Sequence, residues 1–217
     1  SMKQIMIKGV HNTGKTTTVT AVIKELIKRG YTVGSVKDIH FVGFAIDEEG
    51  TDTWKHAHAG ATTVTARGLE ETDIIHKKKL DLESILCQYD QDYLVIEGDP
   101  GAYCLNIVTG EKTEDLDERM DERTIAFSGI IGEKLQSYKG LPVLNNKKDI
   151  KKMVDLIEKE VKRMAKERKE TEVKMYFDDK EVPMVPFVEA IIRGSIMGIA
   201  KELKGYEEGC EVKIVTK

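Results

Sequence analysis

The sequence predicts an α/β protein in which helices cover both faces of a mostly parallel sheet. A short β-branched run at 5–7 stops at a glycine, and from Lys15 apolar residues recur at helical spacing until Gly30. A second strand pattern follows at 31–37. The order strand, helix, strand predicts parallel pairing with right-handed crossovers, because such units pack in this way.

The other elements follow from the same patterns of hydrophobic spacing. From Ile150 an amphipathic helix pattern closes the first domain, whereas the stretch 39–51 has glycines and acids without a clear period. Such a stretch favours a mobile loop over a ligand. Further strands are expected at 62–65, 93–97, 102–108, 124–127 and 141–144, and further helices at 52–59 and 82–89.

The segment from Gly9 to Thr16 has the pattern G-x-x-x-x-G-K-[ST], which is typical of phosphate-binding P-loops. Its glycines let backbone amides turn toward phosphate oxygens at a helix N-terminus, where the helix dipole also favours negative charge. We expect Lys15 to reach the β- and γ-phosphates and the Thr16 hydroxyl to bind Mg²⁺. The fold class is therefore a P-loop NTPase with three α/β/α layers. The expected binding residues of this loop are Gly9, Asn12, Thr13, Gly14, Lys15, Thr16 and Thr17.

A charged connector divides the 217 residues into two regions. Residues 1–169 are expected to form the P-loop nucleotide-binding domain. Residues 170–217 are expected to form a small C-terminal appendage of β-α-β pattern. Its predicted elements are a strand at 173–177, a helix at 186–204 and a strand at 211–215.

Composition narrows the function classes. Hydrophobic residues make up 40% and charged residues 33%, a balance typical of soluble globular proteins. The net charge of −4 argues against nucleic acid as a partner. Three cysteines without C-x-x-C spacing favour a reducing compartment, here the cytoplasm. We see no signal-peptide pattern, and the longest apolar stretch, 185–200, is shorter than the roughly 20 residues of a membrane span.

Glu97 ends the apolar run that begins at Tyr93, as the acid of a Walker B strand does. Its carboxylate would then face Mg²⁺ or the water around the ion. The alternative is helix capping, because acids end many parallel strands for that reason. Lys15 would then be the catalytic lysine of the site. The metal-binding residues would be Thr16 and Glu97.

Lys37 and His40 stand at the end of the second strand, on the edge where ligands of open α/β sheets bind. Asp47 and Asp52 lie in the loop beyond and are candidate catalytic acids, since a carboxylate there could orient Mg²⁺ or the attacking water. Both acids can equally be solvated loop residues. A lone histidine is more often a surface or core residue than a ligand.

The segment 145–149 contains the pattern N-K-x-D, which resembles the guanine-reading loop of GTPases. Asn146 and Asp149 would then contact the base, with the Asp149 carboxylate accepting hydrogen bonds from guanine. The competing interpretation is structural, because Asp149 directly precedes the helix from Ile150 and suits its N-cap.

Several of these segments, taken in order, resemble the molybdopterin-guanine dinucleotide biosynthesis protein B (MobB) family. The shared pattern begins with the P-loop and continues with Lys37 and His40 after the second strand. An acid-glycine-acid loop follows, and the pattern ends at Glu97-Gly98. The resemblance covers residues 2–165. The sequence departs from the family at 38–41, which has fewer histidines, and at Asp99-Pro100, which stands where the family usually has an aromatic residue and a lysine.

The resemblance implies a GTP-binding protein with weak Mg²⁺-dependent hydrolysis. It also implies an adapter to the nucleotidyltransferase that attaches GMP to molybdopterin in molybdenum cofactor biosynthesis, and a homodimer. Two alternatives share the P-loop: a nucleotide-driven chaperone that inserts a metallocofactor into an enzyme, and a small-molecule kinase. Partners captured with the protein, or transfer of the γ-phosphate to an acceptor, distinguish these functions.

Overall fold

The computed structural model describes residues 2–170, 175–177, 180–182 and 186–203. The chain divides into two compact units, residues 1–162 and 163–217. The division falls within the long helix α5 (Ile150–Glu170). The domain boundary near residue 169 stays a prediction.

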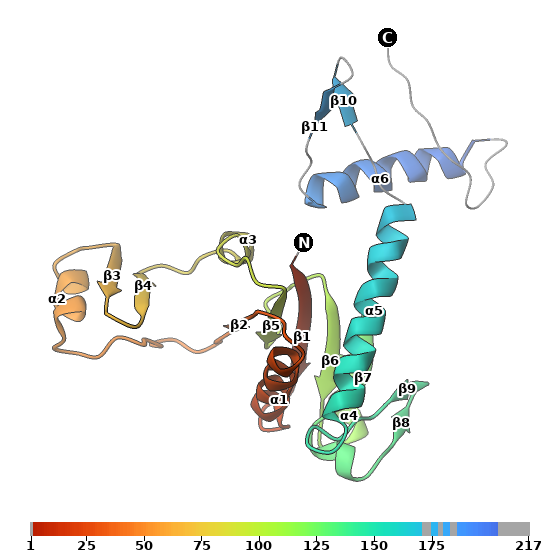
Figure 1. Ribbon diagram of the computed structural model, residues 1–217, viewed down its shortest axis with the longest axis horizontal. Helices are drawn as coiled ribbons and strands as arrows, with labels where there is room; N and C mark the ends of the chain where they lie inside the picture. Colours follow the sequence, from red (N-terminus) through yellow and green to blue (C-terminus); the bar gives the residue numbers. More distant parts are fainter. Residues whose placement is uncertain (1, 171–174, 178–179, 183–185, 204–217) are drawn as a thin grey trace. The chain divides into compact units, whose positions relative to one another are not determined.

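The first unit is built on a sheet of five parallel strands (Figure 1). Strand β1 lies at the centre, with β5 and β2 on one side and β6 and β7 on the other. This confirms the predicted α/β class and the mostly parallel sheet. The strands, in their order across the sheet, are β2 (Val33–Lys37), β5 (Tyr93–Glu97), β1 (Lys3–Gly9), β6 (Leu105–Thr109) and β7 (Thr124–Ser128).

Helices cover both faces of this sheet, which explains why β5, β6 and β7 are buried at every position. On one face, Met6 packs in a cluster to which Leu86 of α3 (Leu82–Leu86) contributes, and Val108 packs against Leu116 of α4 (Thr113–Arg119). On the other face lie α1 (Lys15–Lys28) and α5 (Figure 1). These two helices are joined by Arg29, which bonds Asp155 and Glu158 of α5.

An arm is inserted in the chain between β2 and β5, which are neighbours in the sheet. It consists of α2 (Asp52–His58) and the antiparallel pair β3 (Thr63–Arg67) and β4 (Thr72–His76), which Figure 1 shows at the end of two connecting segments. The sequence predicted α2 and β3 but missed β4. It also treated β3 as a further strand of the protein without recognising this separate pair, because hydrophobic alternation does not reveal a strand's partner.

Other elements also differ from the sequence prediction. The strand expected at 102–108 is β6, which begins only at Leu105, and the helix α4 after it was not predicted. The strand expected at 141–144 is reduced to β9 (Leu141–Pro142), which pairs with β8 (Ser137–Tyr138), while Val143 bridges Phe127. A short 3-10 helix, η1 (Ile130–Glu133), follows β7.

The second unit contains β10 (Met175–Phe177), β11 (Lys180–Val182) and α6 (Pro186–Lys201). The first two form an antiparallel pair. The expected strand and helix are thus present, but the strand pairs with β11, which the sequence reading missed. The strand expected at 211–215 lies outside the described residues.

Candidate functional site

The glycine-rich loop connects the end of β1 to the start of α1, as the motif predicts. Gly14 adopts φ +93° and is the N-cap of α1, a conformation that side-chain-bearing residues avoid. Asn12 also has a positive φ, of +58°. The Thr13 hydroxyl donates to the Val10 carbonyl oxygen at 2.9 Å and lies 2.8 Å from the Thr109 hydroxyl of β6. The loop is therefore held in a closed turn above the carboxyl edge of the sheet.

A second glycine turn, after β7, packs directly against this loop. Gly129 has φ +87°, and a Cβ atom built on it would collide with the Thr13 carbonyl oxygen. The Ile130 amide donates to that same oxygen at 3.3 Å. This contact could not be predicted from the sequence, because nothing in the pattern Ser128-Gly129 indicates which loop the turn contacts. The turn after β7 thus fixes the position of Thr13.

Lys15 begins α1 and its ammonium group lies within the loop. It donates to the carbonyl oxygens of Gly9 at 3.0 Å and Val10 at 2.6 Å. Burial lowers the pKa of Lys15, the Glu97 carboxylate opposes that shift, and the positive charges of Arg119 and Lys37 add to it. A bound anion would therefore stabilise the charged form of Lys15 against these neighbouring cations.

Glu97, at the end of β5, is the carboxylate on which the polar groups of the site converge. It is only 8% exposed, so it requires partners. The Thr16 hydroxyl donates to its Oε1 at 2.7 Å, and the Lys37 ammonium donates to the same oxygen at 3.1 Å. The parallel register explains the meeting, since Lys37 and Ile7 are the residues opposite Glu97 on the two neighbouring strands.

These groups border a cavity of about 840 Å³. Its size is within the usual range for small-molecule sites, about 300–1,000 Å³. The sequence-predicted residues that line it are Gly9, Asn12, Thr13, Gly14, Lys15, Thr16, Thr17, Lys37, His40 and Glu97. The expectation that these ten residues share one site agrees with their placement, while the binding role of each stays a prediction.

Two cationic residues that the sequence analysis did not select also line this cavity, Arg119 and Lys8. Arg119 is the last residue of α4, and its guanidinium pairs with Glu118 at 3.0 Å. It was missed because α4 itself was missed. No motif in the sequence distinguishes Arg119 from the other arginines, so only the fold brings it to the loop.

Lys8 is 4% exposed and its ammonium donates to the Asp121 carboxylate at 2.5 Å. Burial raises the pKa of Asp121, but hydrogen bonds from Lys8 and from the Asn106 amide outweigh it and the pKa is lowered. Asn106 lies on the same sheet face as Lys8, because the register pairs Lys8 with Val108, two residues along β6. This partly buried network joins β1, β6 and the loop after α4 beside the cavity.

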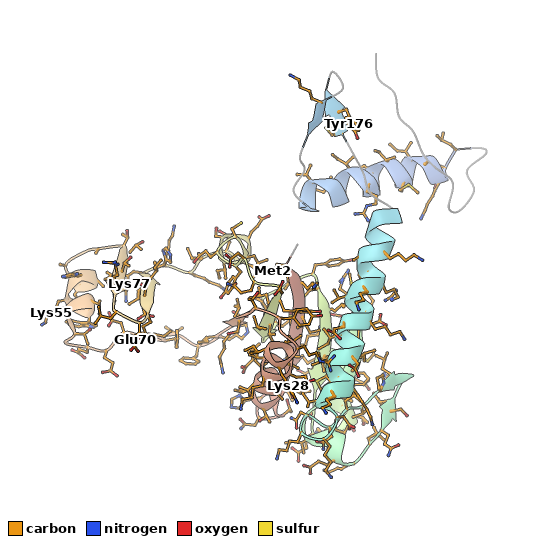
Figure 2. All side chains as sticks on the ribbon, in the orientation of Figure 1. Met2, Lys28, Lys55, Glu70, Lys77 and Tyr176 are labelled. Atoms are coloured by element: carbon orange, nitrogen blue, oxygen red, sulfur yellow. The ribbon has the colours of Figure 1, made fainter. Side chains whose placement is uncertain are left out.

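Asp47 and Asp52 are not among the residues that line the cavity. The Asp47 carboxylate accepts hydrogen bonds from the hydroxyls of Thr51 and Thr53, each at 2.9 Å. Asp52 begins α2 and pairs with Lys55 at 3.0 Å, and Figure 2 labels Lys55 on the arm. Both acids thus hold the start of α2 together. The geometry gives no support to their expected catalytic role.

His40 lines the cavity as expected, and its Nε2 lies 2.9 Å from the Asp38 carboxylate. Its side chain is 69% exposed, so it is accessible from the cavity. Asp38 is largely covered, and its backbone amide donates to the Glu97 carbonyl oxygen at 2.9 Å. The end of β2 is therefore fixed to the end of β5.

Asn146 and Asp149 lie near the loop but outside the cavity lining. The Asn146 amide donates to the Thr18 hydroxyl of α1 at 3.2 Å. The Asp149 carboxylate accepts hydrogen bonds from the Asn145 backbone amide at 3.0 Å and from the Lys152 ammonium group at 3.1 Å. These bonds lower the pKa of Asp149. Both residues have structural contacts, and the bonds of the Asp149 carboxylate hold the turn before α5 and a lysine of its first turn. The N-cap interpretation of Asp149 stays a prediction. A role in base recognition stays a prediction.

The loop and its surroundings fit a nucleotide phosphate with Mg²⁺. The Gly14 backbone conformation is one that a Cβ atom would strain, which is a requirement for backbone amides to line a phosphate. The Thr16 hydroxyl and the Glu97 carboxylate are oxygen donors 2.7 Å apart, the ligand type that a hard cation prefers. Among the described residues no group of three or more His, Cys, Asp or Glu residues has the arrangement of a metal site.

The parallel sheet, the strand-loop-helix turn and the acid at the end of the neighbouring strand define a protein of the P-loop NTPase-like fold. The chain belongs to the molybdopterin guanine dinucleotide synthesis protein B (MobB) family, which it matches over residues 4–124, or 121 of its 217 residues.

Relatives agree with this assignment. A protein of Methanocaldococcus jannaschii, described as a molybdopterin-guanine dinucleotide biosynthesis adapter protein, is 25% identical over 233 aligned residues, covering 98% of this chain and 97% of that protein. A Bacillus subtilis protein with the same description is 26% identical over 145 residues, covering 65% of this chain and 84% of that protein. Similarity to the first relative thus extends through the appendage.

Solved structures show the same fold. The crystal structure of Bacillus subtilis MobB superposes with a TM-score of 0.62 at 23% identity, covering 71% of this chain and 98% of that one. A MobB homologue from Bacillus stearothermophilus gives a TM-score of 0.56 at 19% identity, covering 75% of this chain and 99% of that one. The shared structure is thus almost the whole of those proteins.

Within the described part of the chain, none of the helices combines the length and hydropathy that crossing a membrane requires.

Proposed function

We propose that this chain is a GTP-binding adapter protein of molybdopterin guanine dinucleotide biosynthesis, with weak Mg²⁺-dependent GTPase activity. The observation that carries the proposal is the convergence of Lys15, Thr16 and Glu97 on one cavity behind a glycine-rich loop. Membership of the MobB family and the names of the relatives support the biosynthetic role.

Each residue of the cavity has a distinct task in this proposal. Lys15 binds the β- and γ-phosphates as a point charge, and the backbone amides of 12–17 hold phosphate oxygens at the start of α1. Thr16 and Glu97 hold the magnesium ion or its water shell. Bound Mg²⁺ neutralises phosphate charge and so favours cleavage of the terminal phosphate. Lys37 keeps the Glu97 carboxylate in position.

The weakness of the expected hydrolysis has a structural reason. The acids that the sequence suggested as catalytic, Asp47 and Asp52, hold the arm together and do not line the cavity. Asp38 and Asp99 do line it, but each already lies beside a basic side chain, His40 and Lys8 respectively. Phosphoryl transfer requires a positioned nucleophile as well as charge stabilisation. A site that binds the triphosphate well and positions water poorly suits an adapter.

The proposed partner is the nucleotidyltransferase that attaches GMP to molybdopterin, and the proposed assembly is a homodimer in the cytoplasm. The description of the relatives as adapter proteins supports a partner enzyme. Capture of that nucleotidyltransferase on the immobilised protein, in the presence of GTP and Mg²⁺, is the expected result. Capture of a metalloenzyme subunit instead would favour the cofactor-insertion function.

Competition for a fluorescent GTP analogue tests nucleotide binding. Unlabelled GTP is expected to displace it, and Lys15→Ala to weaken binding roughly tenfold or more, because a charge-assisted bond to phosphate contributes about 1.5–3 kcal/mol. Lys24→Ala, on an exposed position of the same helix, is the matched control and should bind as the wild type. Unchanged affinity in Lys15→Ala would contradict the proposed site.

The same assay tests base choice. If Asn146 and Asp149 read guanine, ATP competes poorly with the wild type and nearly as well as GTP with Asp149→Ala. Since Asp149 also holds the turn before α5, a thermal melt of the variant must show that it remains folded. Equal displacement by GTP and ATP in the wild type would remove the guanine preference while leaving triphosphate binding intact.

A further inference from the structure

Arg119 lines the nucleotide cavity from the C-terminal end of α4, a short helix that buries little of its own surface. Of the seven residues of α4, Leu116 alone is buried. The chain leaves the helix directly after Arg119, because Met120 has extended backbone angles of φ −71° and ψ 149°. The position of Arg119 therefore depends on what holds the residues that follow it.

Asp121, two residues beyond Arg119, is held by three donors. The Lys8 ammonium donates to one carboxylate oxygen at 2.5 Å, and the Asn106 side-chain amide donates to the other at 2.8 Å. The Arg123 backbone amide also donates to that second oxygen, at 2.8 Å. Hydrogen bonds to an ionised carboxylate are stronger than those between neutral groups. Asp121 thus fixes the turn after α4 to β1 and β6.

Thr124 joins the same turn to a third strand, β7. The Asp121 backbone amide donates to the Thr124 hydroxyl at 2.9 Å, and that hydroxyl donates to the Asn106 side-chain oxygen at 2.8 Å. Asn106 and Thr124 are both buried, and the register places them opposite one another on β6 and β7. The turn is therefore bonded to three neighbouring strands of the sheet.

Lys8 connects this turn to the phosphate loop. It directly precedes Gly9, the first residue of that loop, and is 4% exposed. Its ammonium pairs with Asp121 and lies 4.0 Å from the Asp99 carboxylate. Two carboxylates already compensate its charge, so a phosphate has little to gain from Lys8 itself. A buried ion pair often adds no more stability than apolar side chains of similar size, and its effect is then to fix geometry.

We propose that Lys8 is a positioning residue, which through Asp121 holds Arg119 where its guanidinium contacts the terminal phosphate of the bound triphosphate. The proposal rests on the proposed function for the identity of that ligand, GTP. A guanidinium carries its donors in a fixed planar fork, so a small displacement of the end of α4 weakens the contact. The pair of Lys8 and Asp121 thereby contributes to a preference for GTP over GDP.

Calorimetric titration of the full chain with GTP and with GDP, in the presence of Mg²⁺, tests the proposal. Lys8→Met is expected to lower the ratio of GTP affinity to GDP affinity roughly fivefold, because the bond from Arg119 is weakened. Asp121→Asn should lower the ratio in the same direction, roughly threefold. The matched control is Arg29→Met, which breaks the ion pairs between Arg29 and α5 outside the cavity lining and should keep the wild-type ratio.

Asp121→Asn separates positioning from direct contact with the nucleotide. Asp121 is not among the residues that line the cavity, whereas Lys8 is. If Lys8 bound phosphate directly, removing the carboxylate that compensates its charge would strengthen GTP binding. A raised preference for GTP in Asp121→Asn would therefore overturn the proposal. This variant keeps a side chain of the same size, so it carries the test alone if Lys8→Met does not fold.

A double variant tests whether Lys8 acts through Arg119. In an Arg119→Ala background, Lys8→Met should leave the ratio of GTP to GDP affinity unchanged, because the group that Lys8 positions is gone. A merely structural role of Lys8 would lower stability in both backgrounds without this dependence. Additive losses of the ratio in the double variant would show that the two residues act independently, and the proposal would fail.

Amide hydrogen exchange of the nucleotide-free protein gives a readout that does not depend on GTP. Exchange in the segment 117–123 should be faster in Lys8→Met than in the wild type, since the turn after α4 loses a bond. Unchanged exchange there would overturn the positioning role, whatever the nucleotide affinities. A wild type that binds neither GTP nor GDP contradicts the proposed function and with it the role of Lys8 toward GTP. A wild type that binds both, with a ratio that Lys8→Met and Asp121→Asn leave unchanged, contradicts the role of Lys8 alone.

Discussion

Arg119 is the residue through which the site differs most from what the motifs suggest. It lines the cavity from the end of α4, and its charge contributes to the lowered pKa of Lys15. Burial is the largest cause of the lowered Lys15 pKa, and the Arg119 charge is a smaller one. A guanidinium in this position can form a bond to the terminal phosphate that no backbone amide of the loop duplicates.

We therefore expect Arg119→Ala to weaken binding of GTP roughly tenfold and binding of GDP much less, because the lost bond is to the terminal phosphate. Arg119→Lys should recover part of the loss, since the charge remains. Arg67→Ala, at an exposed position on β3, is the control. Calorimetric titration with GTP and with GDP compares the wild type and the three variants, and equal losses for GTP and GDP would show that Arg119 acts on the protein fold instead.

Cys104 offers a pH-dependent prediction. Burial raises the pKa of its thiol to about 12, from the ordinary value of 9.0, while the Asp121 charge adds to the shift and Lys8 opposes it. The raised pKa leaves about a thousandfold fewer thiolates at pH 8 than an ordinary cysteine has, and the side chain is only 6% exposed.

Iodoacetamide should therefore modify exposed Cys87 in the native protein at pH 8 and leave Cys104 unmodified until urea unfolds the chain. Mass spectrometry of the digested protein reports the two sites separately. Raising the pH to 9 should still leave Cys104 protected, because that pH is below its raised pKa. Equal rates for both cysteines at pH 8 would contradict the buried position.

The sequence predicted those site residues whose chemical type and spacing together form a known motif. The residues from Gly9 to Thr17 and the acid Glu97 were found because a phosphate loop imposes a fixed spacing, and the parallel register then brings Glu97 opposite Ile7. Lys8 and Arg119 were not found, since a single cation carries no spacing signal. Asp47 was selected for its carboxylate alone, and the structure shows that Thr51 and Thr53 already satisfy it.

At the scale of elements, the turn after β7 determines the shape of the phosphate loop. Gly129 combines a positive φ with contact against the Thr13 carbonyl oxygen. Gly140, in the turn between β8 and β9, has a similar φ of +79° and no atom within 4 Å of a built Cβ. Alanine substitutions at the two glycines therefore distinguish the cost of backbone strain from the cost of a steric clash with the loop.

Gly140→Ala should cost about 1–2 kcal/mol of unfolding free energy through backbone strain alone and leave GTP binding unchanged. Gly129→Ala should cost more, roughly 2–4 kcal/mol, because overpacking adds to the strain. It should also weaken GTP binding, since the loop must move away from the new methyl group. Urea unfolding and nucleotide titration check both, and equal effects in the two variants would show that the contact with Thr13 is unimportant.

The elements that the sequence predicted well are those whose own residues show a full hydrophobic pattern, without reference to a partner element. The helix α1 shows one buried stripe, and β5 is an unbroken apolar run because both sheet faces are covered. The missed helix α4 has seven residues, of which only Leu116 is buried, so it shows no periodicity. The pairing of β3 with β4 depends on a partner strand, and sequence spacing does not encode that choice.

At the scale of the whole molecule, the cavity of the proposed nucleotide site lies within the first unit. Its lining residues run from Lys8 to Arg119, and the unit extends to Lys162. The helix α5 completes the unit by burying Met153, Val154 and Ile157 fully. All three precede Lys162, so the burial that α5 provides does not depend on the residues after the predicted boundary at 169.

A chain ending at Lys169 should therefore fold cooperatively and bind GTP within about twofold of the full chain, as expected when no lost residue touches the ligand. A chain ending at Lys148 is the contrasting control. It lacks α5 and exposes the surface that Met153 and Ile157 cover, so at about 2–5 kcal/mol for each large buried side chain it should not retain a stable fold. Thermal melts with and without GTP compare the three chains. If the chain ending at Lys169 melts like the full chain but no longer responds to GTP, residues 170–217 take part in nucleotide binding and the site is not confined to the first unit.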